Sequence, residues 1–169
     1  WEETTRVPLI FAGPGIATDQ ICPRPAGLID VFPTLLDLTR LPPRADLEGK
    51  SLKPLLENPK ARWNRPTICT FGPNNHSLRD ERYRYTRYAD GSEELYDHKH
   101  DPNEWNNLLA SKEPNVENRQ VADRLKYWLP TYNADPVAGS AGSDSPLYGE
   151  GTIPLSEAMK RGEVQRKAR

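Results

Sequence analysis

Three polar residues in the middle of the chain carry side chains suited to binding an anion. Asn75, His76 and Arg79 stand close together at the entrance of a predicted strand. Arginine offers a planar fork of N–H donors, and histidine and asparagine offer directed ones, so together they could bind an oxyanion. The competing interpretation is a loop histidine whose hydrogen bonds are satisfied by its neighbours. On the residues alone this second interpretation is favoured.

A second group combines histidines with carboxylates. His98 and His100 flank Lys99, beside Asp97 and Asp101. Histidine and aspartate at close spacing can chelate a metal ion. However, the group falls on a solvated connection after a predicted strand, and no further ligands complete it. We therefore expect a polar turn and no metal site.

Arginines alternate with tyrosines in a third stretch, and this pattern could bind nucleic acid. The arginines are Arg82, Arg84 and Arg87, but neighbouring acids cancel them, so we expect a solvated face with ion pairs. The whole chain of 169 residues has a formal net charge of -1, which favours neither nucleic acid nor an anionic membrane as a partner. The two cysteines, Cys22 and Cys69, are too few for a disulfide scaffold, and the sequence leaves their pairing open.

The first 64 residues show an alternation of strand and helix signals. Val7 to Ala12 is a continuous apolar run that ends in Gly-Pro-Gly, which predicts a strand buried on both faces of an α/β sheet. Apolar residues at helical spacing from Leu28 to Leu38 predict a helix that either begins near Asp30, with Pro33 in its first turn, or is kinked at Pro33. A short helical turn is expected at 52–56.

From residue 65 the pattern changes to short strands. Four runs, at 67–71, 76–80, 83–88 and 94–97, have short connections, one of them the hairpin dipeptide Asp90-Gly91, and they predict an antiparallel meander. Trp105 and Leu108 are expected to plug the apolar face of the sheet. The stripe from 116 to 129 predicts a helix packed on that face. The segment 133–169 is rich in Ala, Gly, Ser and Pro and is expected to be an extended tail.

Several segments, in order and spacing, resemble the second half of sulfatases. They are "WEETTRVPLIFAGPGI", "GLIDVFPTLLDLTRLPP", "LEGKSLKPLL" and "SLRDERYRYTRYADGSEELYDHKHDPNEWNNL", and they are most similar to the iduronate-2-sulfatase-like branch. The resemblance implies an alkaline-phosphatase-like α/β fold. Residues 1–64 would end the large domain, and 65–132 would form a small α+β domain with a four-stranded antiparallel sheet and a C-terminal helix.

The same resemblance sets expectations for chemistry. Sulfatases use a formylglycine nucleophile and a calcium ion, and both would lie upstream of this chain. Cys22 sits in "CPRPA", which departs from the family's nucleophile motif at its third and fifth positions, so we do not expect Cys22 to be the nucleophile. Loops before the strands of the small domain can reach substrate in this family. This favours His76 as a substrate-binding residue, with Asn75 and Arg79 as second choices.

The resulting prediction is the C-terminal portion of a sulfuric ester hydrolase that acts on a sulfated glycan, inactive by itself. Its partners would be an N-terminal sulfatase domain or chain and the carbohydrate, with no catalytic residue and no metal in this chain. Family resemblance favours a periplasmic, secreted or lysosomal location, though the residues leave the compartment open. Two alternatives stay open: a non-catalytic module that binds sulfated or acidic sugars, and part of a related phosphoesterase.

Overall fold

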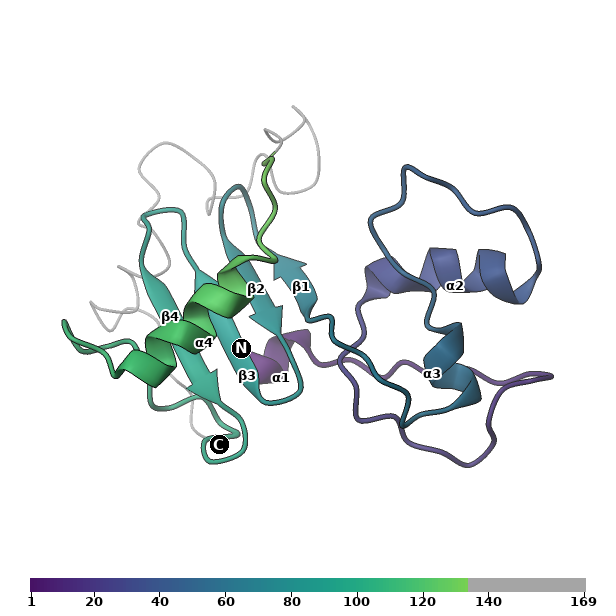
Figure 1. Cartoon of the computed structure of the whole chain (residues 1–169), viewed down its shortest axis with the longest axis horizontal. Helices are drawn as coiled ribbons and strands as arrows, with labels where there is room; N and C mark the ends of the chain where they lie inside the picture. The colour runs from purple at the N-terminus through teal and green to yellow at the C-terminus, as the bar shows by residue number, and fades with distance from the viewer. Residues whose placement is uncertain (134–169) are drawn as a thin grey trace. The chain divides into compact units, whose positions relative to one another are not determined.

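A computed structural model describes residues 1–133, which contain short helices and one four-stranded sheet (Figure 1). The tail expected at 133–169 lies outside the described residues, apart from Asn133. The chain divides into two compact units. Unit 1 comprises residues 1–69, 78–84 and 96–106, and unit 2 comprises 70–77, 85–95 and the described residues from 107 onward. The strands run through both units, and the domain boundaries at 64 and 132 stay predictions.

The sheet has the predicted meander. Its strands are β1 (Thr67–Thr70), β2 (His76–Arg79), β3 (Tyr83–Arg87) and β4 (Glu93–Asp97), in the order β1-β2-β3-β4. Neighbouring strands are joined by short hairpins, and connections this short permit only antiparallel pairing. Gly91, with φ 82°, supplies the left-handed residue of the β3–β4 turn. The expected α/β class and antiparallel sheet are confirmed.

Helix α4 (Val116–Lys126) covers the sheet, as Figure 1 shows in green. It begins at Asn115, whose side chain accepts a hydrogen bond from the Glu117 N–H at 2.7 Å. Its buried residues are Ala122 and Leu125. Arg119 and Lys126 extend from the helix to the Glu93 carboxylate of β4, at 2.5 and 2.6 Å. The buried apolar residues and these ion pairs together hold α4 in place within unit 2.

The predicted plug is only partly correct. Trp105 is 67% exposed and Leu108 is half-buried, whereas Leu109, which was not predicted, is buried. The Asp101 carboxylate accepts hydrogen bonds from the backbone N–H groups of Trp105 and Asn106, at 3.0 and 2.8 Å. Glu104, which precedes the tryptophan, has φ 57° and is 2% exposed. The turn therefore directs the Glu104 side chain inward and leaves Trp105 outside.

The strand expected at Val7 to Ala12 is absent from the described structure. The segment follows helix α1 (Glu2–Thr5) as irregular chain, with Val7 54% and Ile10 86% exposed. A strand needs a neighbour to receive its backbone hydrogen bonds, and the described residues pair no strand with this segment. The apolar pattern indicates a surface that needs covering, but it does not reveal what covers it.

Helices α2 (Val31–Leu38) and α3 (Lys53–Glu57) lie where the sequence predicts helices, and a 3-10 turn, Leu28–Asp30, precedes α2. Buried Asp30 organises this region. Its carboxylate accepts hydrogen bonds from the N–H of Gly27 at 3.0 Å, from the N–H of Lys50 at 2.9 Å and from Arg65 at 2.9 Å. One carboxylate thus ties together three segments of unit 1.

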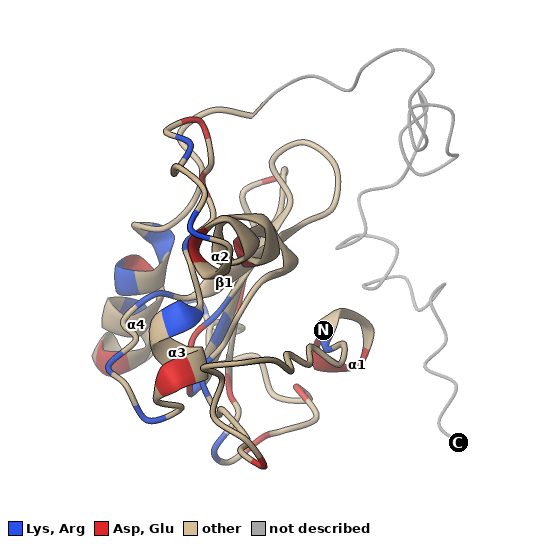
Figure 2. Cartoon of the chain, turned by 90° about the vertical axis from the view of Figure 1, so that its right-hand side faces the viewer, with Lys and Arg blue, Asp and Glu red and all other residues tan. Residues whose placement is uncertain are grey.

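Basic and acidic residues are interspersed along the described ribbon (Figure 2). This distribution agrees with the near-zero net charge. Among the described residues, no helix has the length and apolar character needed to span a bilayer.

Candidate functional site

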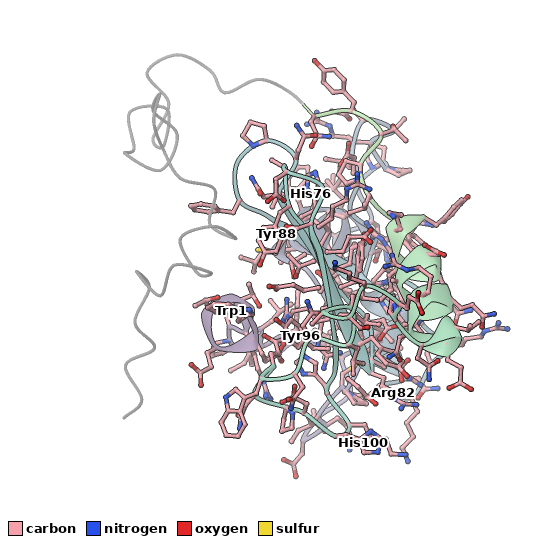
Figure 3. All side chains as sticks on the ribbon, turned by 90° about the vertical axis from the view of Figure 1, so that its left-hand side faces the viewer. Trp1, His76, Arg82, Tyr88, Tyr96 and His100 are labelled. Carbon is pink, nitrogen blue, oxygen red and sulfur yellow. The ribbon has the colours of Figure 1, made fainter. Side chains whose placement is uncertain are left out.

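His76 opens β2, directly after the hairpin loop 71–75, and only 5% of it is exposed. Its Nδ1 lies 2.9 Å from the Thr70 hydroxyl of β1, and its Nε2 lies 2.7 Å from the Asn133 side-chain oxygen. Figure 3 labels His76 above Tyr88, which also belongs to unit 2. Both ring nitrogens of His76 therefore have partners inside the chain.

The hydrogen bonds assign the tautomer of His76. Asn133 Oδ1 also accepts a hydrogen bond from the backbone N–H of Asn74, at 3.4 Å, so the atom facing His76 is an acceptor. The proton must then be on Nε2, and in the neutral ring Nδ1 accepts from the Thr70 hydroxyl. His76 consequently presents a fixed N–H donor at the hairpin.

Asn75 supports the hairpin. Its side-chain nitrogen donates to the carbonyl of Pro73 at 3.0 Å, and its side-chain oxygen accepts from the N–H of Ala89 at 3.0 Å. The N–H of Phe71 donates to the Asn75 carbonyl at 3.0 Å and closes the loop. These bonds use the amide of Asn75 to hold the backbone next to His76.

Arg79 points away from His76. Side chains alternate between faces along a strand, and residues 76 and 79 are an odd number of positions apart. Arg79 instead lies 3.4 Å from the Glu2 carboxylate and donates to the carbonyl of Asp80. Burial lowers the pKa of the Arg79 guanidinium, an effect that Glu2 opposes. The structure therefore places His76 and Asn75 together and separates Arg79 from them.

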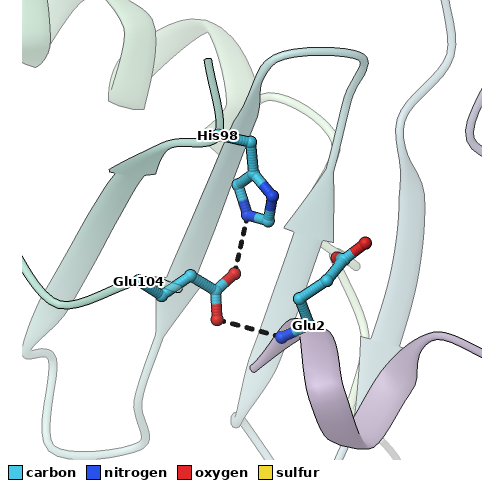
Figure 4. A group of neighbouring side chains, drawn as sticks. All are labelled: Glu2, His98 and Glu104. Carbon is cyan, nitrogen blue, oxygen red and sulfur yellow. Dashed lines mark hydrogen bonds and ion pairs between the residues drawn. The ribbon is translucent and has the colours of Figure 1, made fainter. Parts of the chain in front are cut away.

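A second cluster, which the sequence did not reveal, joins Glu2, His98 and Glu104 (Figure 4). His98 Nε2 is 2.7 Å from one oxygen of Glu104, and the other oxygen accepts the N–H of Glu2 at 2.9 Å. All three side chains offer ligand atoms within 4.8 Å of one another. By spacing alone, the group could hold a metal ion.

Arg84 changes the chemistry of this cluster. Only 2% of it is exposed, and its guanidinium lies 2.5 Å from Glu104 Oε1 and 2.6 Å from Glu2 Oε2. With Arg79 beside Glu2, two positive side chains already balance two carboxylates. A divalent cation would have to displace Arg84 and leave a guanidinium buried without its partners, at a large cost. The arrangement is an ion-pair network, here called the Arg84 network.

The network strongly favours the ionised form of Glu104. Burial acts to raise the pKa of Glu104, but the hydrogen bond from His98, the charge of Arg84 and the N–H of Glu2 outweigh it and lower the pKa to about 2. The expectation of a solvated arginine face is thus wrong at Arg84. Its inward orientation follows strand alternation, but its partners, 20 and 82 positions away, leave no local signal.

A match to a protein-family model shows the family to which the chain belongs. The model for "N-sulphoglucosamine sulphohydrolase, C-terminal" matches residues 1–131. The chain belongs to this sulfatase family. The resemblance seen in the sequence is confirmed, and the chain is a C-terminal sulfatase segment.

Relatives in several organisms agree with that membership. A sulfatase of Formosa agariphila is 35% identical over 164 residues, which cover 95% of this chain and 32% of the relative. A Delta 4,5-hexuronate-2-O-sulfatase of Bacteroides thetaiotaomicron is 37% identical over 128 residues, and the match covers 68% of this chain and 26% of the relative. A solved 2-O GAG sulfatase superposes with a TM-score of 0.56 at 31% identity, and the match covers 70% of this chain and 28% of the solved one. This sulfatase chain thus spans about a quarter to a third of the length of these relatives.

A further group of polar residues in the sulfatase chain consists of Arg82, Asp97 and His100. Arg82 donates two hydrogen bonds, of 2.9 and 2.7 Å, to the Asp97 carboxylate. His100 Nδ1 lies 2.8 Å from the same carboxylate, and Figure 3 labels both Arg82 and His100. Arg82 in particular lowers the pKa of Asp97. His98 turns to Glu104 instead, so the two histidines do not share a site. Cys22 and Cys69 are free and exposed.

Proposed function

We propose that this chain is the C-terminal portion of an enzyme that hydrolyses sulfate esters of a sulfated glycan. The observation that carries the proposal is the sulfatase family match over residues 1–131. The 2-O-sulfatase relatives favour a hexuronate 2-O-sulfate as the substrate group. The chain contributes structure and substrate contacts and is inactive alone.

Formylglycine and calcium belong, in this proposal, to polypeptide outside this chain. Calcium prefers six to eight oxygen ligands. Among the described residues, the Arg84 network contains the one group whose ligand atoms lie close enough together to hold a metal ion. Its carboxylates, however, are already paired with guanidinium groups. It therefore does not fit calcium. The nucleophile and metal would supply attack on sulfur and charge stabilisation when the enzyme is whole.

The partner of the chain is, we infer, the N-terminal portion of the same sulfatase. Unit 1 exposes several large apolar side chains, a group here called the open face, and an accumulation of such side chains often indicates an interaction site. Its members are Val7, Leu9, Ile10, Ile21, Leu28, Phe32 and Leu35, with exposed fractions from 37% to 92%. The matches cover only 32% and 26% of the two curated relatives, so these relatives contain further polypeptide that could cover the open face.

His76 is the proposed substrate contact. Its Nε2–H is a donor in a fixed position on a hairpin that Asn75 stabilises. A sugar carboxylate or sulfate is a good acceptor for a hydrogen bond from such a donor. Asn75 supports this contact by holding the loop. A substrate contact by Arg79 stays a prediction, since Arg79 is directed to Glu2 in unit 1.

The test uses the complete enzyme that contains this chain. We expect it to release sulfate from a 2-O-sulfated unsaturated disaccharide. His76→Ala should lower kcat/KM by roughly 10- to 100-fold, the usual range for a lost hydrogen bond to a charged group. His100→Ala, at an exposed histidine, is the matched control and should leave kcat/KM unchanged.

Two results would contradict the proposal. The first is sulfate release by this chain alone, because the chain would then hold its own nucleophile. The second is a complete enzyme that cleaves phosphate esters but releases no sulfate from glycans. Equal kcat/KM for His76→Ala and the unaltered enzyme would remove His76 from the site while leaving the sulfatase function intact.

A further inference from the structure

Two N–H donors converge on one oxygen atom in unit 2. His76 Nε2 lies 2.7 Å from Asn133 Oδ1, and the backbone nitrogen of Asn74 lies 3.4 Å from the same atom. Asn74 has φ 60°, a left-handed conformation that asparagine tolerates better than most residues. Paired donors aimed at one point are a common way to bind an anionic oxygen.

We propose that Asn74 N–H and His76 Nε2–H form a binding site for an anionic oxygen of a sugar substituent, a sulfate or a carboxylate. In the structure, Asn133 occupies this site through its neutral amide oxygen. The ligand enters when Asn133 moves out. The choice of ligand rests on the proposed function, whereas the donor pair rests on geometry alone.

The donors are held in place independently of Asn133. Thr70 binds Nδ1 of His76 from the neighbouring strand and fixes the ring. Asn75 ties the loop to the carbonyl of Pro73 and to the N–H of Ala89. Because these bonds persist when Asn133 leaves, the site needs little reorganisation before it accepts a ligand.

An anionic oxygen can compete with the oxygen of Asn133. Hydrogen bonds to charged acceptors are about twice as strong as bonds between neutral groups. Asn133 is half-buried and Asn74 is exposed, so the site lies at the surface. The 57 positions between His76 and Asn133 also mean that the backbone near the ring can stay fixed while Asn133 departs.

The experiment compares this chain with its Asn133→Ala and Asn133→Asp variants. The ring nitrogens of His76 are followed by 15N NMR during titration with sodium methyl sulfate or with sodium acetate, at constant ionic strength set with chloride. We expect the unaltered chain to show the Nε2–H tautomer. Asn133→Ala should bind methyl sulfate at least about tenfold more tightly than the unaltered chain, since no amide competes. Asn133→Asp should weaken binding, because its carboxylate stays and repels anions.

The two titrants distinguish the ligand sources. Tighter binding of methyl sulfate indicates a sulfate site, and tighter binding of acetate indicates a site for the uronate carboxylate. Asn103→Ala, at an exposed asparagine of unit 1, is the matched control and should behave as the unaltered chain. A doubly substituted chain, His76→Gln with Asn133→Ala, should lose most of the binding.

The proposal is overturned by an Nδ1–H tautomer in the unaltered chain, or by a response of Asn133→Ala to both anions that equals its response to chloride. Backbone spectra show whether each variant is folded. Saturable binding together with a complete enzyme that releases no sulfate would instead remove the proposed function and keep the site. The two failures are therefore separable.

Discussion

At the scale of single residues, Arg84 joins distant parts of unit 1. It contacts Glu2 and Glu104, which lie 82 and 20 positions away, and its Nη2 also donates to the Thr5 hydroxyl at 3.1 Å. Arginine suits this role because its fork of donors can serve several acceptors without losing its charge. Removing it leaves two carboxylates in a poorly hydrated place.

We expect Arg84→Met to lower the free energy of unfolding by about 3–5 kcal/mol, the usual cost of removing one partner from a buried ion pair. Arg84→Lys should cost less, because the charge stays while the fork is lost. Urea unfolding followed by circular dichroism measures both. Arg6→Ala, at an exposed arginine, should change stability by less than about 0.5 kcal/mol. If Arg84→Met leaves the chain as stable as Arg6→Ala does, the network contributes nothing to folding.

The Arg84 network also predicts a dependence of stability on pH. The pKa of Glu104 falls from its ordinary 4.5 to about 2 on folding, so the unfolded chain binds the proton more readily. The stabilisation is complete above pH ~4.5 and is lost as the pH falls toward 2, and it amounts to roughly 3 kcal/mol. Unfolding free energies at pH 6, 4 and 3 should therefore decrease stepwise.

Glu104→Gln serves as the matched variant for this pH series. It should be less stable at pH 6 and show a shallower decrease, with the remaining slope coming in part from Glu93, whose pKa is also lowered to about 2. If the unfolding free energy of the unaltered chain and that of Glu104→Gln decreased equally with falling pH, Glu104 would titrate alike in the folded and unfolded chains.

At the scale of elements, the turn before α2 and the segment before α3 approach each other closely. The Asp30 carboxylate accepts the N–H of Lys50, and Thr34 accepts the N–H of Leu52 at 2.8 Å. This contact requires Gly49. A Cβ added there would lie 2.0 Å from the carbonyl oxygen of Ile29, so the backbone would have to move.

Gly49→Ala should therefore lower the free energy of unfolding by about 1–3 kcal/mol, the usual cost of overpacking. Gly13→Ala is the matched control, because its added Cβ would meet only Ile16 at 3.9 Å. Differential scanning calorimetry of the two variants gives the comparison. If both melt at the same temperature, the close approach at Ile29 is not a constraint on this part of the fold.

The sequence predicts elements well where their signals are local. Period-two alternation and the Asp90-Gly91 turn place β2, β3 and β4 within one residue of their observed bounds. His76 stands out in the sequence because its hairpin neighbours are polar. Glu104 escapes notice because an acid in a turn looks the same whether it faces solvent or a buried arginine. Asn133 escapes notice because only the fold brings it to His76.

At the scale of the whole molecule, the open face of unit 1 contrasts with the buried centre of the sheet. Leu95 and Tyr85 are fully buried, whereas Ile10 and Ile21 are 86% and 92% exposed. The strand prediction at Val7 to Ala12 is wrong for the same reason, since the pattern suits neighbours that the described residues do not supply. The interface with the N-terminal portion that we propose would cover the open face.

Replacing Ile10 and Ile21 by serine tests this interpretation. In the chain alone, the double variant should keep its unfolding free energy within about 0.5 kcal/mol, because both side chains are already in water, and it should self-associate less in analytical ultracentrifugation. In the complete enzyme the same change should lower the melting temperature by several degrees, since each buried isoleucine contributes about 1.5–3 kcal/mol. Val116→Ser, at a 71% exposed position of α4, is the control and should leave both proteins unchanged. A complete enzyme that tolerates the double change as well as the isolated chain does would mean that the open face faces solvent in the sulfatase too.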